Sequence, residues 1–356
     1  MRRQNSLFFY FSDGTLHDTD EHTMTFNWPY TTDERLRTLL EPQISHATLS
    51  HAYVFHGIAG SGKDSLMRTF ARAIQCGATG RPCGSCESCT AHKRHSHPDF
   101  VDIGFFSQGG QEITVDMVRE FTRSLLHRSV LTESKIGLIS GAEHLTLVAA
   151  NALLKILEEP PAQVVILMSS SDLASMPATL LSRCQAIHVR RLPAQTMRLL
   201  YAGEETKGAN AEECLILAGG RIALMERLLN GGLNDHHGRI SAIITMLSLF
   251  PNTISQELDA VFRKQKKASV DGKISQRFVR ELIQDLESVI RDMLVVHLTP
   301  RLVRNIHFKS EIQTLARQLH PTRALHLLRS LFMHQQSIVR DSGNPQLHCE
   351  YLFLGV

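Results

Sequence analysis

The sequence predicts a parallel α/β domain followed by helical domains, and three observations support this prediction. A short apolar run at 52–55 leads into a glycine-rich turn and then a helix from about Lys63 to Gln75. Two more apolar runs of strand length, 135–140 and 163–168, enclose an apolar helix from about Leu145 to Glu159 that stops at two prolines. Strand signals are lacking in the C-terminal part, where helical periods dominate. Strands that alternate with helices indicate a parallel sheet covered by helices.

The composition indicates a globular protein and excludes several classes. The chain has 356 residues, of which 43% are hydrophobic and 21% are charged, so it matches neither a disordered nor a collagen-like sequence. Its longest apolar runs, such as Val164–Met168, are far shorter than the stretch of about 18 residues that a membrane span needs. The formal charge is only +3, so any contact with DNA must come from local patches. The apolar stretch 7–11 is too short for a signal peptide, so we expect a cytoplasmic protein.

The pattern along the chain predicts an extension and three domains. Residues 1–23 are mostly polar and lack a sustained period, so we expect a loose extension, with Met24 as a candidate native start. The predicted domains are an α/β domain over 24–191, a small helical domain over 192–234 and an all-helical domain over 235–356.

Residues 57–63 fit the first seven positions of the P-loop pattern, in which backbone N–H groups cradle phosphates and the lysine reaches the terminal ones. A strand precedes them and a helix follows, as this motif requires. The eighth position normally supplies a Ser or Thr hydroxyl to Mg²⁺, but here it is Asp64. The candidate nucleotide-binding residues of this degenerate loop are Gly57, Gly60, Gly62, Lys63, Asp64 and Ser65.

Asp64 leaves two interpretations open. Its carboxylate lies at a predicted helix N-terminus, where the dipole favours negative charge, so it can stand in for part of the phosphate and repel a nucleotide. At roughly 4 Å this repulsion is about 1 to 4 kcal/mol per charge pair. On this interpretation the loop is a vestige that serves as a tight turn. Alternatively, Asp64 binds Mg²⁺ directly and ATP is still held.

The strand that carries the acidic residues of P-loop ATPases also departs from the working pattern. It is predicted over 135–139 and ends in Ser140 and Gly141, where an ATPase would show Asp and Glu. Glu143 follows two residues later, and we expect it to cap a helix or to be solvated. The missing acids and Asp64 both indicate that ATP is not hydrolysed.

Four of the seven cysteines are grouped with the spacing C-x6-C-x2-C-x2-C, and an odd total argues against a secreted disulfide framework. A structural Zn²⁺ satisfies four thiolate ligands and leaves no open position for catalysis. A redox pair or an iron–sulfur cluster fits this spacing less well. The neighbouring His92, His95 and His97 are expected to be solvated or capping residues. The predicted zinc ligands are Cys76, Cys83, Cys86 and Cys89.

Five stretches occur in a specific order between about residue 30 and residue 190. They are the strand and P-loop at 50–63, the cysteine loop after the P-loop helix, His97-Pro98-Asp99, the run 151–161 that reads NALLKILEEPP, and Leu181-Ser182-Arg183-Cys184. Together they resemble the AAA+ clamp-loader subunits of bacterial replication. The resemblance implies an AAA+ domain with an inserted zinc loop, a small helical lid domain and an all-helical C-terminal collar domain.

Within this family the sequence is most similar to the delta-prime branch. The resemblance implies that gamma/tau-like members carry Thr at position 64, Asp-Glu at 140–141 and a lid arginine at the position of Ile222. Arg221, one residue earlier, is expected to face elsewhere, since one helical step turns about 100°. A delta-prime-like chain is a stator that does not hydrolyse ATP but presents Arg183 as an arginine finger to a neighbouring gamma/tau subunit. Ser170 matches the polar sensor position of the family, with capping of the next turn as its alternative role.

The same resemblance implies partners. It predicts a hetero-oligomer with the gamma/tau and delta subunits of the DNA polymerase III clamp loader, associated through the complex with the sliding clamp and primer-template DNA. The basic run 263–267 is a candidate for phosphate contacts, although such a run is more often a solvated face. Two other functions stay open: a gamma/tau-like motor in which Asp64 holds Mg²⁺ and Glu143 orients water, and a zinc-dependent DNA-binding adaptor.

Overall fold

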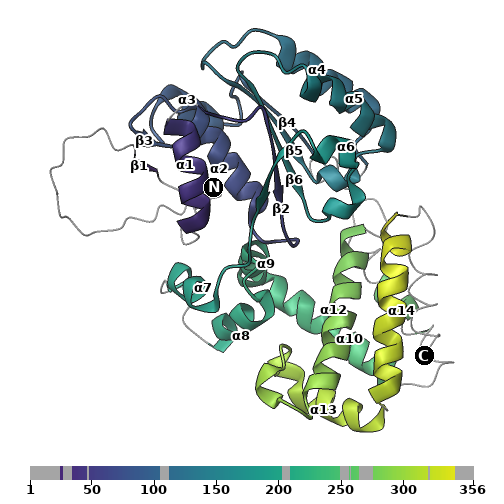
Figure 1. The fold of residues 1–356 in the computed structure, drawn as a ribbon. Helices are drawn as coiled ribbons and strands as arrows, with labels where there is room; N and C mark the ends of the chain where they lie inside the picture. The colour runs from purple at the N-terminus through teal and green to yellow at the C-terminus, as the bar shows by residue number, and fades with distance from the viewer. Residues whose placement is uncertain are drawn as a thin grey trace.

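The computed structural model describes residues 25–26, 34–45, 48–104, 112–202, 209–248, 256, 258–263, 276–319 and 321–340. In these parts of the chain, a sheet lies between two helical layers and a series of helices follows it (Figure 1). The expected extension 1–23, Met24 and the lysines of the basic run 263–267 lie outside the described residues.

A five-stranded parallel sheet forms the centre of the α/β domain, in the order β4-β5-β6-β2-β7. The strand that precedes the P-loop, β2, therefore lies between β6 and β7. Ligands of open parallel sheets bind at the carboxyl ends of the strands, which is where the P-loop begins. The strands are β2 (Ala52–His56), β4 (Phe100–Gly104), β5 (Lys135–Ser140), β6 (Val164–Ser170) and β7 (Gln185–His188).

The strands expected at 52–55, 135–140 and 163–168 are confirmed, with ends that shift by at most two residues. All residues of β5 and β6 are buried, because helices cover both faces of the sheet and leave no polar face. The strand β4 was not expected. It is an edge strand that pairs only with β5, and Asp102 interrupts its apolar pattern.

Helices on the two faces of the sheet build two separate cores. One core packs α1 and α2 on the sheet and contains Leu40, Phe55 and Phe70, whereas the other packs α4, α5 and α6 and contains Phe121 and Leu153. Figure 1 shows these two helical layers on either side of the strands. The helices are α1 (Glu34–Ser45), α2 (Lys63–Gln75), α3 (Glu87–Lys93), α4 (Val115–Leu126), α5 (Leu147–Glu158) and α6 (Ala178–Leu181), with the 3₁₀ turns η1 (Ala142–His144) and η2 (Leu173–Ser175).

Two further hydrophobic cores follow the sheet, one between Met197 and Leu233 and one between Ile240 and Leu331. Every described element after β7 is helical, as expected, while the domain limits at 192 and 235 stay predictions. These elements are α7 (Ala194–Leu200), α8 (Ala209–Ala218), α9 (Ile222–Arg227), the π-helical turn η4 (Leu228–Gly232), α10 (Leu233–Ser248), α12 (Gln276–Val295), η5 (Pro300–Leu302), η6 (Ile306–Phe308), α13 (Lys309–Gln318) and α14 (Pro321–Arg340).

A second, two-stranded parallel sheet was not expected. It pairs β1 (Thr25–Phe26) with β3 (Gly80–Arg81), which lies inside the cysteine loop. Strands of two residues are too short to show a period in a sequence. In the described part of the chain, no helix combines the length and the apolar character needed to cross a membrane.

Asp99, the last residue of His97-Pro98-Asp99, stabilises the loop at residues 130–132, which precedes β5. Its fully buried carboxylate accepts hydrogen bonds from the backbone N–H groups of Val130, Leu131 and Thr132, at 2.7, 2.7 and 2.8 Å. Burial by itself raises the pKa of Asp99, but these hydrogen bonds outweigh it and hold the pKa below its ordinary value of 3.8. The residue therefore has a structural role in the fold.

We expect Asp99→Asn to lower the free energy of unfolding by about 2 to 4 kcal/mol, because the amide turns one acceptor into a donor that faces N–H groups. Since the folded pKa of Asp99 is below 3.8, its contribution is complete above that pH and is lost as the pH falls through the folded value. Urea denaturation at a series of pH values should therefore show wild type and variant converging in acid.

Asp116→Asn is the matched control for this experiment. The Asp116 carboxylate is 85% exposed and pairs with Arg119 at the surface, so its loss should cost less than about 0.5 kcal/mol. Equal destabilisation by the two substitutions would contradict the role given to Asp99.

Candidate functional site

The glycine-rich loop has the backbone shape of a phosphate-binding turn. Gly60 and Gly62 have φ angles of 80° and 89°, in the left-handed region that favours glycine. Gly62 is the N-cap of α2, so the first N–H groups of that helix open toward the loop. Gly57 lies so close to the chain after β7 that a Cβ on it would come 2.2 Å from the Val189 carbonyl oxygen.

The Asp64 carboxylate is engaged within the chain. Its Oδ1 accepts a hydrogen bond from Ser169 Oγ at 2.6 Å, and Ser169 Oγ accepts one from Gly141 N at 3.1 Å. These two bonds connect the start of α2 to the ends of β6 and β5. Mg²⁺ would have to compete with Ser169 for this carboxylate, which favours the interpretation that Asp64 takes over part of the role of a phosphate.

Lys63 also has partners inside the chain. Its ammonium group donates to Ser171 Oγ at 2.9 Å and to the carbonyl of Ile58 at 3.2 Å, and the residue is only 5% exposed. Burial lowers the pKa of Lys63, and the carboxylates of Asp64 and Glu143 partly counter this. The lysine thus folds back between its own loop and the end of β6.

The expected sensor residue and the residue beside Lys63 differ by one position. Ser170 is fully buried, and its Oγ accepts a hydrogen bond from Asp172 N at 3.1 Å, so it caps the turn after β6. The hydroxyl that contacts Lys63 belongs to Ser171. Because residues 169–171 are all serines, the sequence alone could not show which of them contacts Lys63 and which caps the turn. A sensor role for Ser170 stays a prediction.

Glu143 neither caps a helix nor is solvated, and the expectation for this residue was wrong. Its side chain is 13% exposed, and its Oε1 accepts a hydrogen bond from Ser171 N at 3.1 Å. The reason is the turn η1, which begins after Gly141 in the left-handed region at φ 75° and returns the chain toward the end of β6. A carboxylate therefore lies beside the lysine of the loop, although not at the end of β5.

Three buried oxygen atoms in and beside the loop lack hydrogen-bond partners among the described residues, namely Ser61 Oγ, Ser140 Oγ and Glu143 Oε2. Buried polar atoms of this kind are usually satisfied by ordered water or by a ligand. The loop therefore fits a nucleotide, whose phosphates would meet the loop N–H groups and Lys63. Ser140 and Gly141 stand at the end of β5, where the resemblance predicts the acid pair of ATP-hydrolysing members.

The first turn of α9 packs onto the loop. Ala223 N donates to the carbonyl of Gly60 at 3.2 Å, and Ile222 Cδ1 would lie 3.0 Å from a Cβ on Gly62. An apolar side chain therefore contacts the loop at position 222. The Arg221 guanidinium donates to the carbonyls of Leu217 and Ala218 at the end of α8, although its Cβ lies next to Gly60 of the loop.

Arg183 follows α6 and carries a partly exposed guanidinium group. Its Nη2 forms an ion pair with Glu158 Oε1 at 2.7 Å, and its Nη1 donates to the carbonyl of Thr179 at 2.7 Å. The two paired side chains are 35% and 50% exposed, so solvent screens the pair and it contributes at most about 1 kcal/mol. The guanidinium can therefore exchange Glu158 for another anion at low cost.

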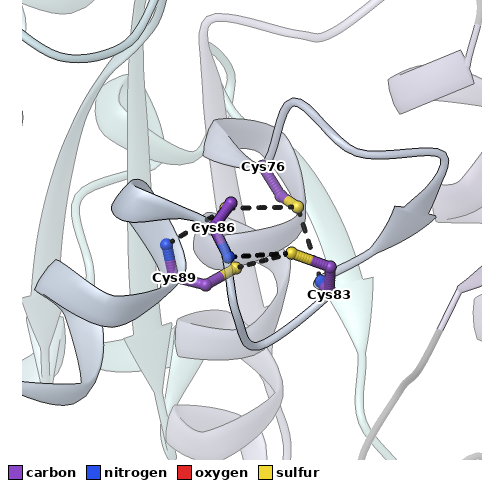
Figure 2. A group of neighbouring side chains, drawn as sticks. All are labelled: Cys76, Cys83, Cys86 and Cys89. Carbon is purple, nitrogen blue, oxygen red and sulfur yellow. Dashed lines mark hydrogen bonds between the residues drawn. The ribbon is translucent and has the colours of Figure 1, made fainter.

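The four predicted zinc ligands converge in the structure (Figure 2). Their sulfur atoms all lie within 4.8 Å of one another, with 3.9 Å between Cys76 and Cys86 and 4.0 Å between Cys83 and Cys89. Thiolates bound at about 2.3 Å around a tetrahedral zinc ion lie about 3.8 Å apart, so this set fits the metal. The separations are far from the value of about 2.05 Å in a disulfide.

The backbone of the cysteine loop prepares the sulfur atoms for a cation. Cys83 N, Cys86 N and Cys89 N each point at the sulfur of the preceding cysteine of the set, at 3.3 to 3.4 Å. Hydrogen bonds from Ser85 and Cys86 lower the pKa of Cys83 to about 6, whereas burial raises the pKa of Cys89 to about 12. A bound Zn²⁺ would stabilise all four thiolates and hold the loop closed.

The three nearby histidines were expected to be solvated or capping. His97 Nδ1 accepts a hydrogen bond from Asp99 N at 3.1 Å, as a capping residue would, whereas His92 is neither solvated nor capping. His92 Nε2 lies 2.7 Å from Gln75 Oε1, and His97 Nε2 lies 3.0 Å from Ser88 Oγ. Burial lowers the pKa of His92 to about 3, so its ring is neutral near pH 7. These rings pack the cysteine loop against the α/β domain, whereas His95 is exposed.

Comparisons with known proteins agree with this arrangement. Residues 32–193 match the family model described as DNA polymerase III, delta subunit. The DNA polymerase III subunit delta' of Haemophilus influenzae is 40% identical over 136 residues, which are 38% of this chain and 41% of the relative. The DNA polymerase III subunit tau of Bacillus subtilis is 28% identical over 255 residues, which are 71% of this chain and 42% of the relative.

Over residues 32–193 this chain is similar to subunits of the DNA polymerase III clamp loader. It spans less than half the length of the curated relatives it matches. Relatives named delta' and relatives named gamma/tau both occur among the matches. Among solved structures, a DNA polymerase III gamma subunit-related protein from Thermotoga maritima covers 83% of this chain and 98% of its own, with 18% identity and a TM-score of 0.44.

The structure adds three residues to the candidate site that sequence reasoning missed or misplaced. Ser169 holds Asp64, Ser171 holds Lys63 and Glu158 holds Arg183. Glu158 had a sequence signal, because it belongs to the run NALLKILEEPP that supported the resemblance, but nothing in the spacing connected it to Arg183.

We expect this chain to be purified with one Zn²⁺ at the cysteine site, and Cys89→Ser to lose it. Removal of a ligand should weaken zinc binding by more than the 10- to 100-fold that loss of an outer-shell partner costs. Metal analysis of the purified protein and competition with a chelator measure this. Cys184→Ser is the control, since Cys184 lies outside the cluster, and it should keep the metal.

We expect Asp64→Thr to strengthen binding of Mg-ATP by about tenfold or more, because it removes a like charge worth about 1 to 4 kcal/mol from the loop. Lys63→Ala should abolish binding in both backgrounds. Titration with a fluorescent ATP analogue measures both effects, and unchanged affinity in Asp64→Thr would show that the carboxylate does not oppose nucleotide.

Proposed function

We propose that this chain is the stator of a DNA polymerase III clamp loader, a delta-prime-like subunit that does not hydrolyse ATP. It would assemble in the cytoplasm with gamma/tau and delta subunits and help to load the sliding clamp on primed DNA. Its catalytic contribution would be Arg183, acting in trans on nucleotide bound by a gamma/tau neighbour. Contacts with DNA would come through the complex and would address the phosphate backbone without reading the sequence.

The observation that carries this proposal is the state of the chain's own loop. Lys63 and Asp64 both have partners within the chain, and Ser140 and Gly141 stand where acids would position metal and water. Phosphoryl transfer depends on that positioning and on charge stabilisation. We therefore expect a subunit with this loop to act on the nucleotide of a neighbouring subunit and not to hydrolyse ATP itself.

The setting of Arg183 supports a role in trans. A finger needs only a positioned guanidinium that reaches charge on the transferring phosphoryl group, and elsewhere this is worth about 10³ to 10⁵ in rate. Arg183 is partly exposed, and its carbonyl contact with Thr179 fixes one edge of the fork. The other edge now meets the Glu158 carboxylate, whose two oxygens present a geometry similar to that of a phosphoryl group.

One observation favours a second candidate, the ATP-hydrolysing gamma/tau-like motor. Glu143 lies beside Ser171 and Lys63 with one carboxylate oxygen unpartnered, which is a suitable place for a group that orients water. On this alternative, Asp64 would release Ser169 to bind Mg²⁺. The two candidates differ in what the isolated chain does with ATP. Turnover abolished by Glu143→Gln and by Lys63→Ala would establish the motor.

We expect Arg183→Ala, reconstituted with a gamma/tau partner, to reduce the ATPase activity of the partner by about 10³-fold or more while assembly survives. The reason is the loss of positive charge at the transferring group. Steady-state ATPase assays on complexes isolated by gel filtration measure both quantities. Unchanged turnover would remove the finger from the proposal.

Two variants serve as controls for this experiment. Arg119→Ala removes another partly exposed, ion-paired arginine on α4, and the partner's ATPase should be unaffected. Arg183→Lys keeps the charge but loses the two-pronged geometry, so activity should be recovered only in small part.

A further inference from the structure

A second group of metal-ligand side chains lies far from the cysteine loop, where α8 meets the C-terminal helices. Glu213 comes from α8, His237 from α10 and His307 from η6. Their ligand atoms all lie within 4.8 Å of one another. Among the described residues, this set and the four cysteines are the two groups of three or more such side chains that meet this distance.

The Glu213 carboxylate is largely buried, and among the described residues it contacts the ring of His237. The Glu213 side chain is 8% exposed, and its Oε1 lies 2.9 Å from His237 Nε2. Buried carboxylates need a cationic partner or a metal, because desolvation of an isolated charge costs several kcal/mol. The buried Glu213 carboxylate therefore needs a positive charge beside it, which a metal ion or a protonated histidine would supply.

The two histidines present their nitrogen atoms side by side. Their rings are stacked, with centroids 4.3 Å apart and planes inclined by 13°. Phe308 meets the His237 ring edge to face at 82° and the His307 ring at 76°, and so fixes both rings from one side. Two imidazolium ions in face contact would repel each other, whereas two neutral imidazoles that share a cation would not.

We infer that Glu213, His237 and His307 form a binding site for a divalent transition-metal ion of the Zn²⁺ class. Two imidazole nitrogens and one carboxylate oxygen are ligands that Zn²⁺ accepts at about 2.0 to 2.2 Å. Ligands at that distance lie about 3.4 Å apart around a tetrahedral ion. The ligand atoms now lie within 4.8 Å of one another, so binding requires the two stacked imidazole rings to rotate until a nitrogen of each points at the same ion. When neutral His237 binds the metal through Nε2, its single ring proton resides on Nδ1, and the metal replaces the contact between Nε2 and Glu213.

The inferred site differs from the cysteine site in chemistry and in consequence. It has three protein ligands, and His307 is exposed, so a fourth position is open to water or to a ligand from outside. Its ligands connect α8 to α10 and η6. Leu233, at the start of α10, packs in the same core as α8, whereas Ile240 of α10 and Phe308 of η6 pack in the C-terminal core. Metal binding would therefore fix the angle between the small helical region and the C-terminal helices.

The test uses the full chain with its cysteine site already filled with Zn²⁺. Titration with Co²⁺ should then show one further equivalent, with the weak d–d bands of nitrogen and oxygen ligands and without the intense thiolate charge-transfer bands of a cysteine site. His307→Ala and Glu213→Gln should each weaken this second equivalent by about tenfold or more while the cysteine site keeps its metal. His297→Ala, which removes an exposed histidine after α12, should leave it unchanged.

Thermal unfolding separates loss of the site from loss of the fold. The wild type should melt at a higher temperature when Zn²⁺ is added beyond one equivalent, and His307→Ala should keep the wild-type melting temperature without added metal but lose this increase. The inference is wrong if the wild type binds only one equivalent, or if a second equivalent is unaffected by His307→Ala and Glu213→Gln.

Discussion

The hydrogen bonds from Gly141 N to Ser169 Oγ and from Ser169 Oγ to Asp64 connect three elements at the carboxyl edge of the sheet. They occupy the carboxylate that stands in place of the usual hydroxyl and join the start of α2 to the ends of β5 and β6. Because Gly141 has a left-handed φ of 75°, the chain can turn there and bring Glu143 back to the loop. The position of nearly every polar group around the P-loop follows from this connection.

The charged residues of the P-loop and the Arg183–Glu158 pair differ in how easily they can change partners, because they differ in burial. Lys63 is buried and Asp64 is half-buried, and each is held by a hydrogen bond to a serine at the end of β6, so these charged groups are expensive to rearrange. The Arg183–Glu158 pair is partly exposed and screened, so it is inexpensive to open. The charged side chains of the P-loop are hydrogen-bonded within the chain, whereas Arg183 can leave Glu158 at low cost. This difference supports the proposed action of Arg183 on a neighbouring subunit.

Much of the sheet and the convergence of the four cysteines could be predicted from sequence, because apolar runs and cysteine spacing are local signals. The strand at 52–55, the helix from Lys63 and the four grouped cysteines are examples. The polar partners could not be predicted in the same way. Whether Ser170 or Ser171 faces Lys63 depends on where the strand ends, and the position of Glu143 depends on a turn whose direction no spacing encodes. The roles of His92 and His97 depend on burial beneath a loop, which only the assembled fold reveals.

The helix α2 is held at both of its ends. Its first residue, Lys63, belongs to the loop, and its last residue, Gln75, is followed directly by Cys76 of the four-cysteine group. Gln75 Nε2 also donates to the carbonyls of Asp99 and Ser134, which fixes that end to the sheet. A helix of 13 residues is about 20 Å long, and with both ends anchored it behaves as a rigid strut. A displacement of the P-loop is therefore expected to move the cysteine end of α2 as well, because neither end of the helix can unwind freely.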